Sequence, residues 1–144
     1  YYISRIKPSN SQKVFFSSIG YDENVYSKEK MLPDNNLNYY DILLITGIAN
    51  PKPLLDHLAR FSKRVKHLKY RDHHNFSEAD IKEILAEYSK LGEYKIILTT
   101  EKDYVRLKTY DSLRQIMYYW PINVVIDRKE DFNKIIIDYI EKNK

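Results

Sequence analysis

Two short segments of the sequence crowd titratable side chains together. Asp72-His73-His74 sets a carboxylate beside two imidazoles, and Thr100-Glu101-Lys102-Asp103 combines a hydroxyl, two acids and a base. Imidazole titrates near neutral pH, so either histidine could accept or donate a proton, orient a phosphate or bind a metal. Asp72 would hold a neighbouring ring in one tautomer. These residue types favour proton transfer or the handling of a phosphate group.

Each segment also has a purely structural interpretation. A histidine can cap a turn, and Thr100 can cap a helix whose dipole is complemented by Glu101 and Asp103. The positive charge of Lys102 interacts unfavourably with the positive end of that dipole in the first turn, so its side chain is expected to extend into solvent or to point at a phosphate. Metal binding is the weaker hypothesis because no matching ligand spacing occurs elsewhere, and we predict no metal site.

The surrounding pattern predicts the elements that position these segments. Apolar runs and period-two alternation predict strands at 14–16, 40–47, 64–70, 94–100 and 122–126, and apolar residues at helical spacing predict helices at 51–61, 77–91, 101–107 and 132–140. Because parallel strands need helical crossovers, this order indicates an α/β fold, a three-layer, Rossmann-like sandwich with a mostly parallel sheet. Ligands bind such sheets at the carboxyl ends of the strands, where both segments fall.

Local signals place the helix boundaries. Asn50 is expected to cap a helix that has Pro51 at its first position. Ser77 and Asp80 form a capping-box pattern, and Gly92 is expected to end the same helix. Residues 20–38 are polar and are expected to form a surface excursion with a small hairpin.

Composition narrows the class of protein. The 144 residues fit one domain, 1–144, and 43% hydrophobic with 31% charged residues is typical of a globular protein. No apolar run approaches the ~20 residues that span a bilayer, and the absence of cysteine fits a reducing compartment. The net charge of +4 suits solvated faces or a surface for phosphates or anionic lipids, and irregularly spaced tyrosines argue against nucleic-acid binding.

Two absences shape the functional interpretation. With only Gly20, Gly47 and Gly92, the chain has no Walker A phosphate loop, and the turn at Gly47-Ile48-Ala49-Asn50-Pro51 lacks a second glycine for close phosphate approach. The sequence starts with Tyr1 and has no initiator Met, so we expect it to be part of a longer protein.

Three motifs in order resemble one known family. The Gly47 to Pro51 turn, Tyr70-Arg71-Asp72-His73-His74-Asn75-Phe76-Ser77-Glu78-Ala79-Asp80 and Thr99-Thr100-Glu101-Lys102-Asp103-Tyr104-Val105-Arg106-Leu107 look like the carboxy-terminal domain of tetraacyldisaccharide 4′-kinase, the lipid A kinase of Gram-negative bacteria. The resemblance covers roughly residues 40 to 126, and residues 1–39 match nothing specific.

The resemblance implies an enzyme that transfers the γ-phosphate of ATP, with Mg²⁺, to the 4′-hydroxyl of tetraacyldisaccharide 1-phosphate. It also implies an amino-terminal P-loop domain as partner, which would bind most of the ATP and Mg²⁺, and a membrane-associated position on the cytoplasmic side of the inner membrane. His73 aligns with the family's functional histidine and would be catalytic. Asp72 would orient it, His74 would be structural, and Thr100, Glu101, Lys102 and Asp103 would face or support the interdomain cleft.

Two other classes of function stay open. An Asp-His-His triplet also marks metal-dependent phosphoesterases, although these need further Asp and His ligands that nothing before residue 72 supplies. A non-catalytic module that binds a sugar phosphate or nucleotide would use the Gly47 turn and the Lys102 segment. On the favoured hypothesis, this chain alone is an inactive half of a kinase.

Overall fold

The computed structural model describes residues 2–143, and these form two compact units. The larger unit comprises residues 21–121 and holds the main sheet, while the smaller one combines residues 2–20 with residues 122–143. Each unit is described separately below. Within the described residues, no helix is long and apolar enough to cross a bilayer.

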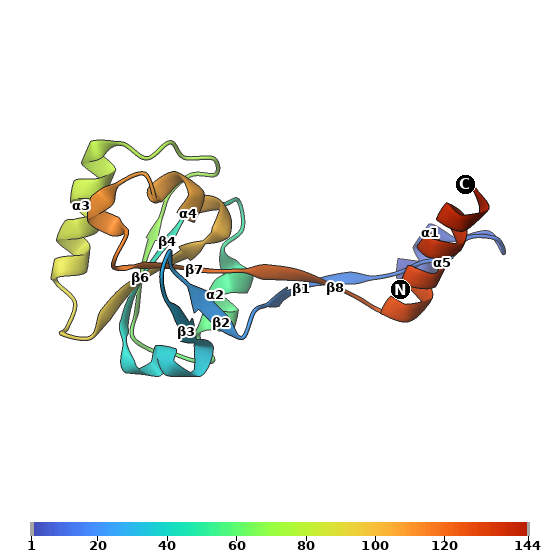
Figure 1. The fold of residues 1–144 in the computed structure, drawn as a ribbon, viewed down its shortest axis with the longest axis horizontal. Helices are drawn as coiled ribbons and strands as arrows, with labels where there is room; N and C mark the ends of the chain where they lie inside the picture. The colour runs from blue at the N-terminus through green and yellow to red at the C-terminus, as the bar shows by residue number, and fades with distance from the viewer. Residues whose placement is uncertain (1, 144) are drawn as a thin grey trace. The chain divides into compact units, whose positions relative to one another are not determined.

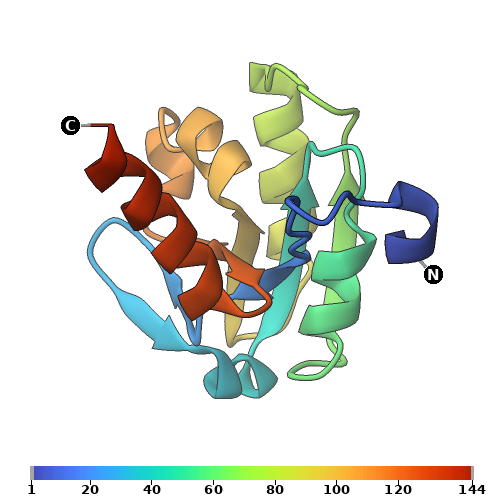
Figure 2. The same ribbon diagram turned by 90° about the vertical axis from the view of Figure 1, so that its right-hand side faces the viewer.

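The larger unit is built on a six-stranded sheet with the strand order β3-β2-β7-β6-β4-β5 (Figure 2). Its strands are β2 (Asn24–Tyr26), β3 (Met31–Pro33), β4 (Asp41–Thr46), β5 (Val65–Lys69), β6 (Lys95–Thr100) and β7 (Met117–Trp120). Strands β5, β4, β6 and β7 pair in parallel, whereas β2 pairs antiparallel with both β3 and β7. The sheet is therefore mostly parallel, with an antiparallel hairpin at one edge.

Helices cover both faces of this sheet (Figure 1). On one face, α2 (Lys52–Leu58) packs Leu54 and Leu58 against Ile42 and Leu44 of β4. On the other face, α3 (Glu78–Ser89), α4 (Glu101–Leu107) and the 3-10 turn η2 (Asp111–Leu113) cover β4, β6 and β7. The three-layer α/β sandwich predicted from the sequence is confirmed.

Strand β4 lies at the centre of the core because both of its faces are covered. Ile42, Leu43, Leu44 and Ile45 are fully buried and alternate between the two hydrophobic clusters. A continuous apolar run, without polar alternation, is the pattern expected for a parallel strand between two helical layers. The prediction of a buried strand at 40–47 is confirmed.

Helix boundaries follow the local signals with small shifts. Ser77 and Asp80 form the predicted capping box of α3, with the Ser77 N–H donating to Asp80 Oδ2 at 2.7 Å. The cap of α2 is Pro51 and not Asn50, although Asn50 Oδ1 still accepts from Lys52 N at 3.2 Å. Helix α3 ends at Ser89, before Gly92, where a Cβ would come within 2.7 Å of Asp41 Oδ2.

The hairpin predicted within residues 20–38 is present as β2 and β3, followed by the 3-10 helix η1 (Asp34–Tyr39). It is not only a surface excursion, since Val25 and Leu37 are fully buried in the core. These single apolar residues among polar neighbours carry no periodic signal, and the neighbouring sheet edge is what buries them.

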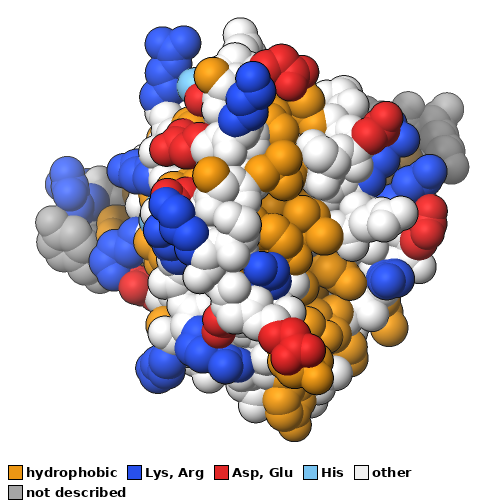
Figure 3. Space-filling model, turned by 90° about the vertical axis from the view of Figure 1, so that its left-hand side faces the viewer, with side chains coloured by type: hydrophobic (Ala, Val, Ile, Leu, Met, Phe, Trp, Pro, Cys, Tyr) orange, Lys and Arg blue, Asp and Glu red, His pale blue; other side chains and the backbone are white. Residues whose placement is uncertain are grey.

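The face of this unit that carries α3 mixes Lys and Arg with Asp and Glu side chains (Figure 3).

Two strand predictions need correction. The strand near the amino terminus is β1 (Ser17–Tyr21) and not 14–16, and it pairs with β8 (Ile122–Ile126) in a separate two-stranded sheet. The strand beside β6 is β7, which the sequence analysis left unassigned. Its aromatic residues, at 118–120, gave no clear alternation, and its partner β6 decided its conformation.

The smaller unit contains this β1–β8 sheet with α1 (Tyr2–Ile6) and α5 (Lys129–Lys142). Helix α5 includes the predicted amphipathic helix at 132–140 and packs Phe132 edge-to-face on Phe15, with ring centroids 5.3 Å apart. Gly20 allows the two strands to approach, because a Cβ there would lie 2.9 Å from Val125 Cγ2. No described residue of this unit belongs to the fully buried hydrophobic core.

An aromatic cluster in the larger unit surrounds His57 of α2. Its ring stacks on Tyr21 at 4.2 Å and meets Trp120 edge-on at 4.7 Å, and Trp120 Nε1 donates to Asp22 O at 2.7 Å. The buried Nε2 of His57 has no hydrogen-bond partner among the described residues. Burial, and then repulsion from Arg60, lowers the pKa of this imidazole.

We predict that the chain loses stability as the pH falls below about 6.5, the pKa of an unfolded histidine. The unfolded state binds a proton there that the folded state excludes from His57, and burial lowers the pKa of His67 in the same direction. Urea unfolding between about pH 8 and about pH 5.5 measures this loss. His57→Phe, which keeps the aromatic packing, should reduce the pH dependence; an unchanged slope would contradict the assignment.

Candidate functional site

The carboxyl ends of β4, β5 and β6 meet at one edge of the sheet. Thr46 pairs with Lys69 of β5, and Ile45 pairs with Thr99 of β6, so the loops after these strands start side by side. The turn after β4 begins with Gly47, whose carbonyl accepts from the His73 N–H at 3.1 Å. Three motifs, each separated from the next by 18 residues, therefore meet in one place, as the strand order requires.

Asp103 in the first turn of α4 is the buried centre of this edge. Its side chain is fully buried, and Oδ2 accepts from the Gly47 N–H and from the Thr100 hydroxyl, both at 2.8 Å. The other oxygen, Oδ1, lies 3.6 Å from Arg106 Nη1. A buried carboxylate is stable only when it is paired and hydrogen-bonded. Oδ2 has its hydrogen bonds and Arg106 supplies the opposite charge, while the buried Oδ1 has no hydrogen-bond partner among the described residues.

His73 stands at the rim of the site in a strained backbone conformation. Its φ of 56° lies in the left-handed region, which costs a side chain other than glycine about 1 kcal/mol. The side chain is 72% exposed. Lys102 Nζ lies 3.3 Å from its Nε2, and Arg106 Nη2 lies 3.5 Å from its Nδ1. The predicted catalytic residue is thus an accessible imidazole between two cationic side chains.

Asp72 contacts the same group from the preceding position. Its Oδ1 accepts from Lys102 Nζ at 3.3 Å and from the His73 N–H at 3.0 Å, while Oδ2 lies 3.8 Å from His73 Nε2. Partial burial raises the pKa of Asp72, but the hydrogen bond from Lys102 and the attraction of His73 and Lys102 outweigh it and lower the pKa overall. Asp72 is therefore an anion at neutral pH.

His74 faces away from this group and supports the fold. Its Nε2 lies 3.0 Å from Asp80 Oδ2, and its ring stacks on Tyr70 with centroids 4.8 Å apart. Hydrogen bonds from Ser77, with His74 as a further donor, lower the pKa of Asp80. His74 joins the turn after β5 to the cap of α3.

The remaining residues of the second segment have different surroundings. Thr100 caps α4, since its hydroxyl accepts from the Asp103 N–H at 3.1 Å. Glu101 is exposed on the first turn of α4, and its side chain makes no hydrogen bond or ion pair with the described residues. Lys102 reaches Asp72 and His73. Among the described residues of this segment, only Lys102 bonds directly to the histidine loop, whereas Asp103 bonds to the Gly47 turn.

Arg106 was not among the residues predicted from the sequence. Its guanidinium joins Asp103 Oδ1, the His74 carbonyl at 3.3 Å and the His73 ring. A signal was available, because Asp103 and Arg106 lie three residues apart and so share one helix face. What this face contacts depends on the register of β5 and β6.

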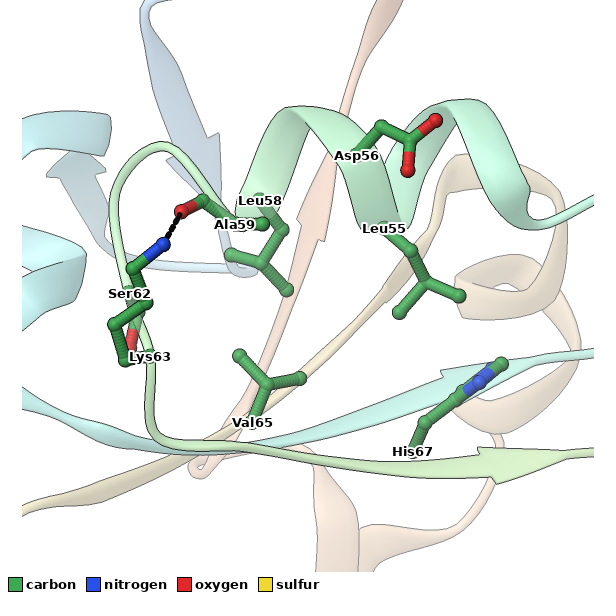
Figure 4. Close-up of a pocket in the computed structure, with 8 residues that line it drawn as sticks. All are labelled: Leu55, Asp56, Leu58, Ala59, Ser62, Lys63, Val65 and His67. Carbon is green, nitrogen blue, oxygen red and sulfur yellow. Dashed lines mark hydrogen bonds between the residues drawn. The ribbon is translucent and has the colours of Figure 1, made fainter.

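A separate pocket of about 360 Å³ lies between α2 and β5 (Figure 4). It is lined by Leu55, Asp56, Leu58, Ala59, Ser62, Lys63, Val65 and His67. None of these residues belongs to the two predicted segments, and Lys63 Nζ is already bonded to the Ala59 carbonyl at 3.0 Å. Among the described residues, no group of three His, Asp or Glu side chains is placed to share a metal ion.

The family of the chain follows from comparisons with known proteins. The model of the family described as tetraacyldisaccharide-1-P 4′-kinase matches residues 5–141. The chain belongs to this family. The match extends beyond residues 40 to 126 on both sides, so the region before residue 40, which resembled nothing specific, is also part of the family pattern.

Individual relatives are similar over nearly the whole chain. The tetraacyldisaccharide 4′-kinase of Bacteroides thetaiotaomicron is 38% identical over 99% of the chain, and that of Flavobacterium johnsoniae is 39% identical over 96%. The chain spans only 38% and 39% of the length of these relatives. In a crystal structure of LpxK from Aquifex aeolicus in complex with ATP, 37% of that protein matches 90% of this chain, with a TM-score of 0.58 and 17% identity. That likeness supports the fold.

We predict that His73→Gly is more stable than His73→Ala by about 1 kcal/mol, because glycine adopts a positive φ without strain. Both variants lose the ring contacts, so their difference in urea unfolding isolates the backbone. As a control, Lys90 has a φ of −79°, and there the alanine variant should be the more stable one. Equal stability of the two His73 variants would show that the position carries no strain.

Proposed function

We propose that this chain is the carboxy-terminal part of a lipid A kinase that transfers the γ-phosphate of ATP to the 4′-hydroxyl of tetraacyldisaccharide 1-phosphate. Membership of the family over residues 5–141 carries the proposal. The convergence of Gly47, His73 and Lys102 at one edge of the sheet supports it, because this edge is where α/β sheets bind their ligands.

In this proposal, His73 is the catalytic residue of the chain. Its exposed ring can reach a ligand, and Asp72 fixes the turn that presents it through the hydrogen bond to the His73 N–H. Lys102 adds a positive charge 3.3 Å from the ring. Phosphoryl transfer depends mainly on positioning and on neutralising charge, and these groups supply both.

ATP and Mg²⁺ are assigned to another part of the longer protein. The described residues contain no cluster of three carboxylates or imidazoles suited to a metal ion, and the chain has no glycine-rich phosphate loop. This chain therefore does not fit Mg²⁺ by itself. Its residues would approach the nucleotide and the lipid head group from the opposite side of a cleft formed with a P-loop domain.

The smaller unit supplies a surface for that partner domain. It leaves many large apolar side chains exposed, among them Val124 (71%), Ile19 (55%) and Ile137 (53%). A unit of this size with no fully buried hydrophobic residue among those described gains little from its own core. So many exposed apolar side chains on a small unit point to an interface, and we propose that the rest of the longer protein covers them.

The same proposal places the longer protein at the cytoplasmic side of the inner membrane, where an acylated disaccharide is accessible. The net charge of +4 is compatible with an approach to anionic head groups. A metal-dependent phosphoesterase is not favoured, because the family match points elsewhere and the described residues offer no ligand cluster. A binding module without chemistry would bind a sugar phosphate but show no turnover in the full protein.

The test of this function is 4′-kinase activity with ATP, Mg²⁺ and disaccharide 1-phosphate. We expect turnover by the full-length protein and none by the 144-residue chain. His73→Ala in the full-length protein should lower turnover by about 10²-fold or more, as the loss of a catalytic group does. Lys63→Ala, in the loop before β5 and so at the other end of that strand, is the matched control. Turnover of the His73 variant at the control level would remove His73 from the reaction.

The proposed partner surface has its own test. Val124→Asp places a charge on the exposed apolar face and should lower the melting temperature of the full-length protein, since a charge buried in an interface is costly. The same change should leave unfolding of the 144-residue chain nearly unaltered. Asn123→Asp is the matched control, because neighbouring strand residues point to opposite faces. Equal melting temperatures for full-length wild type and Val124→Asp would contradict an interface at Val124.

A further inference from the structure

Two hydrogen-bond donors, one from Lys102 and one from Arg106, face the nitrogens of the His73 ring, but a neutral ring can accept only one hydrogen bond. Lys102 Nζ lies 3.3 Å from Nε2, and Arg106 Nη2 lies 3.5 Å from Nδ1. Lysine and arginine side chains only donate hydrogen bonds, whereas a neutral imidazole has one donor and one acceptor nitrogen. Only one of the two cations can therefore bond to the neutral ring, and the choice between them sets its tautomer.

Arg106 is the more firmly held of the two. Its guanidinium pairs with the fully buried Asp103 at 3.6 Å and donates to the His74 carbonyl at 3.3 Å, and its side chain is only 27% exposed. The planar fork leaves Nη2 directed at His73 Nδ1. Because two of its contacts are to other groups, Arg106 loses little further freedom when it bonds to the ring.

Lys102 has an alternative partner and more freedom. Its ammonium donates to Asp72 Oδ1 at 3.3 Å, and its side chain is 42% exposed on a flexible stem. Asp72 Oδ2 also lies 3.8 Å from His73 Nε2, so a proton on that nitrogen faces a carboxylate. The Asp72 carboxylate therefore favours a protonated Nε2, whereas the Lys102 ammonium opposes it when it bonds to the ring and not when it bonds to Asp72.

We propose that Arg106 is a positioning residue that holds neutral His73 in the Nε2–H tautomer by donating to Nδ1. The ring then presents Nε2–H to its exposed side, and the Lys102 ammonium bonds to Asp72 Oδ1 instead of to the ring. His73 would serve the reaction as a hydrogen-bond donor to an anionic oxygen, together with Lys102, and not as a base through Nε2. This role in the reaction rests on the proposed kinase function, but the tautomer does not.

The tautomer can be measured by ¹⁵N NMR of the imidazole rings in the 144-residue chain at alkaline pH, where histidines are neutral. Protonated and unprotonated ring nitrogens have well-separated shifts, and His73→Gln identifies the resonances of His73. We expect wild type to show the proton on Nε2. A proton on Nδ1 in wild type would overturn the proposal, whether or not any variant folds.

Two variants separate the cations. Arg106→Met keeps a side chain of similar length but removes the guanidinium that donates to His73 Nδ1 and to the His74 carbonyl. The proton on the His73 ring should then move toward Nδ1, because Lys102 becomes the donor to Nε2. Lys102→Met is the matched control and should leave the proton on Nε2. A shift in the Lys102 variant with none in the Arg106 variant would assign the role to Lys102 instead. Where Asp103, left unpaired, prevents Arg106→Met from folding, Arg106→Lys keeps the charge and should still lower the Nε2–H fraction.

Activity of the full-length protein then tests the consequence. Arg106→Met should lower kcat by about tenfold or more with little change in the KM for either substrate, since positioning a group acts in the transition state. An altered tautomer with unchanged kcat would retain the positioning role but sink the donor role of His73. An unaltered tautomer would sink the inference while leaving the kinase function standing.

Discussion

The site depends on one buried carboxylate. Asp103 has no exposure to solvent, and three groups stabilise its charge: the distant Gly47 N–H, and the Thr100 hydroxyl and Arg106 guanidinium of its own helix and cap. Breaking such a set by removing one partner leaves an uncompensated buried charge, which typically costs about 3–5 kcal/mol. The same contacts that stabilise Asp103 therefore fix the start of α4 against the turn after β4. A Cβ at Gly47 would lie 3.0 Å from Asp103 Oδ1, so any larger residue there would push against this carboxylate.

From this centre the geometry extends outward to the histidine loop. The Gly47 carbonyl fixes the backbone of His73, while Arg106 reaches the carbonyl of His74 and the ring of His73. The turn is held on its other side by His74, which pairs with Asp80 at the cap of α3. A positive φ at His73 persists because both sides of the turn are anchored. The loop is thus anchored on both sides and presents one exposed imidazole to solvent, as loops that carry reactive groups on a fixed scaffold commonly do.

The two units differ in how their stability arises. The larger one buries β4 and most of β6 between helical layers, so its own side chains form the hydrophobic core that stabilises it. In the smaller one, the described residues expose the apolar side chains of β8 and α5 to solvent. The relatives are more than twice as long as this chain, and the proposal that a further domain covers this surface accounts for side chains that otherwise have no physical reason to be apolar.

The sequence predicts the alternation of strands and helices, the buried run at β4, the capping box at Ser77 and the family motifs, because each is a local pattern of polarity or hydrogen-bonding type. It did not determine that β8 leaves the main sheet to pair with β1, or that β7 takes its place beside β6, since strand pairing joins residues far apart in the chain. For the same reason it did not distinguish Asp103, expected to face or support a cleft, from the exposed residues of its segment, and it passed over Arg106. Only the register of β4, β5 and β6 brings Gly47, His73 and α4 together, and that convergence decides which side chains are buried supports and which remain accessible.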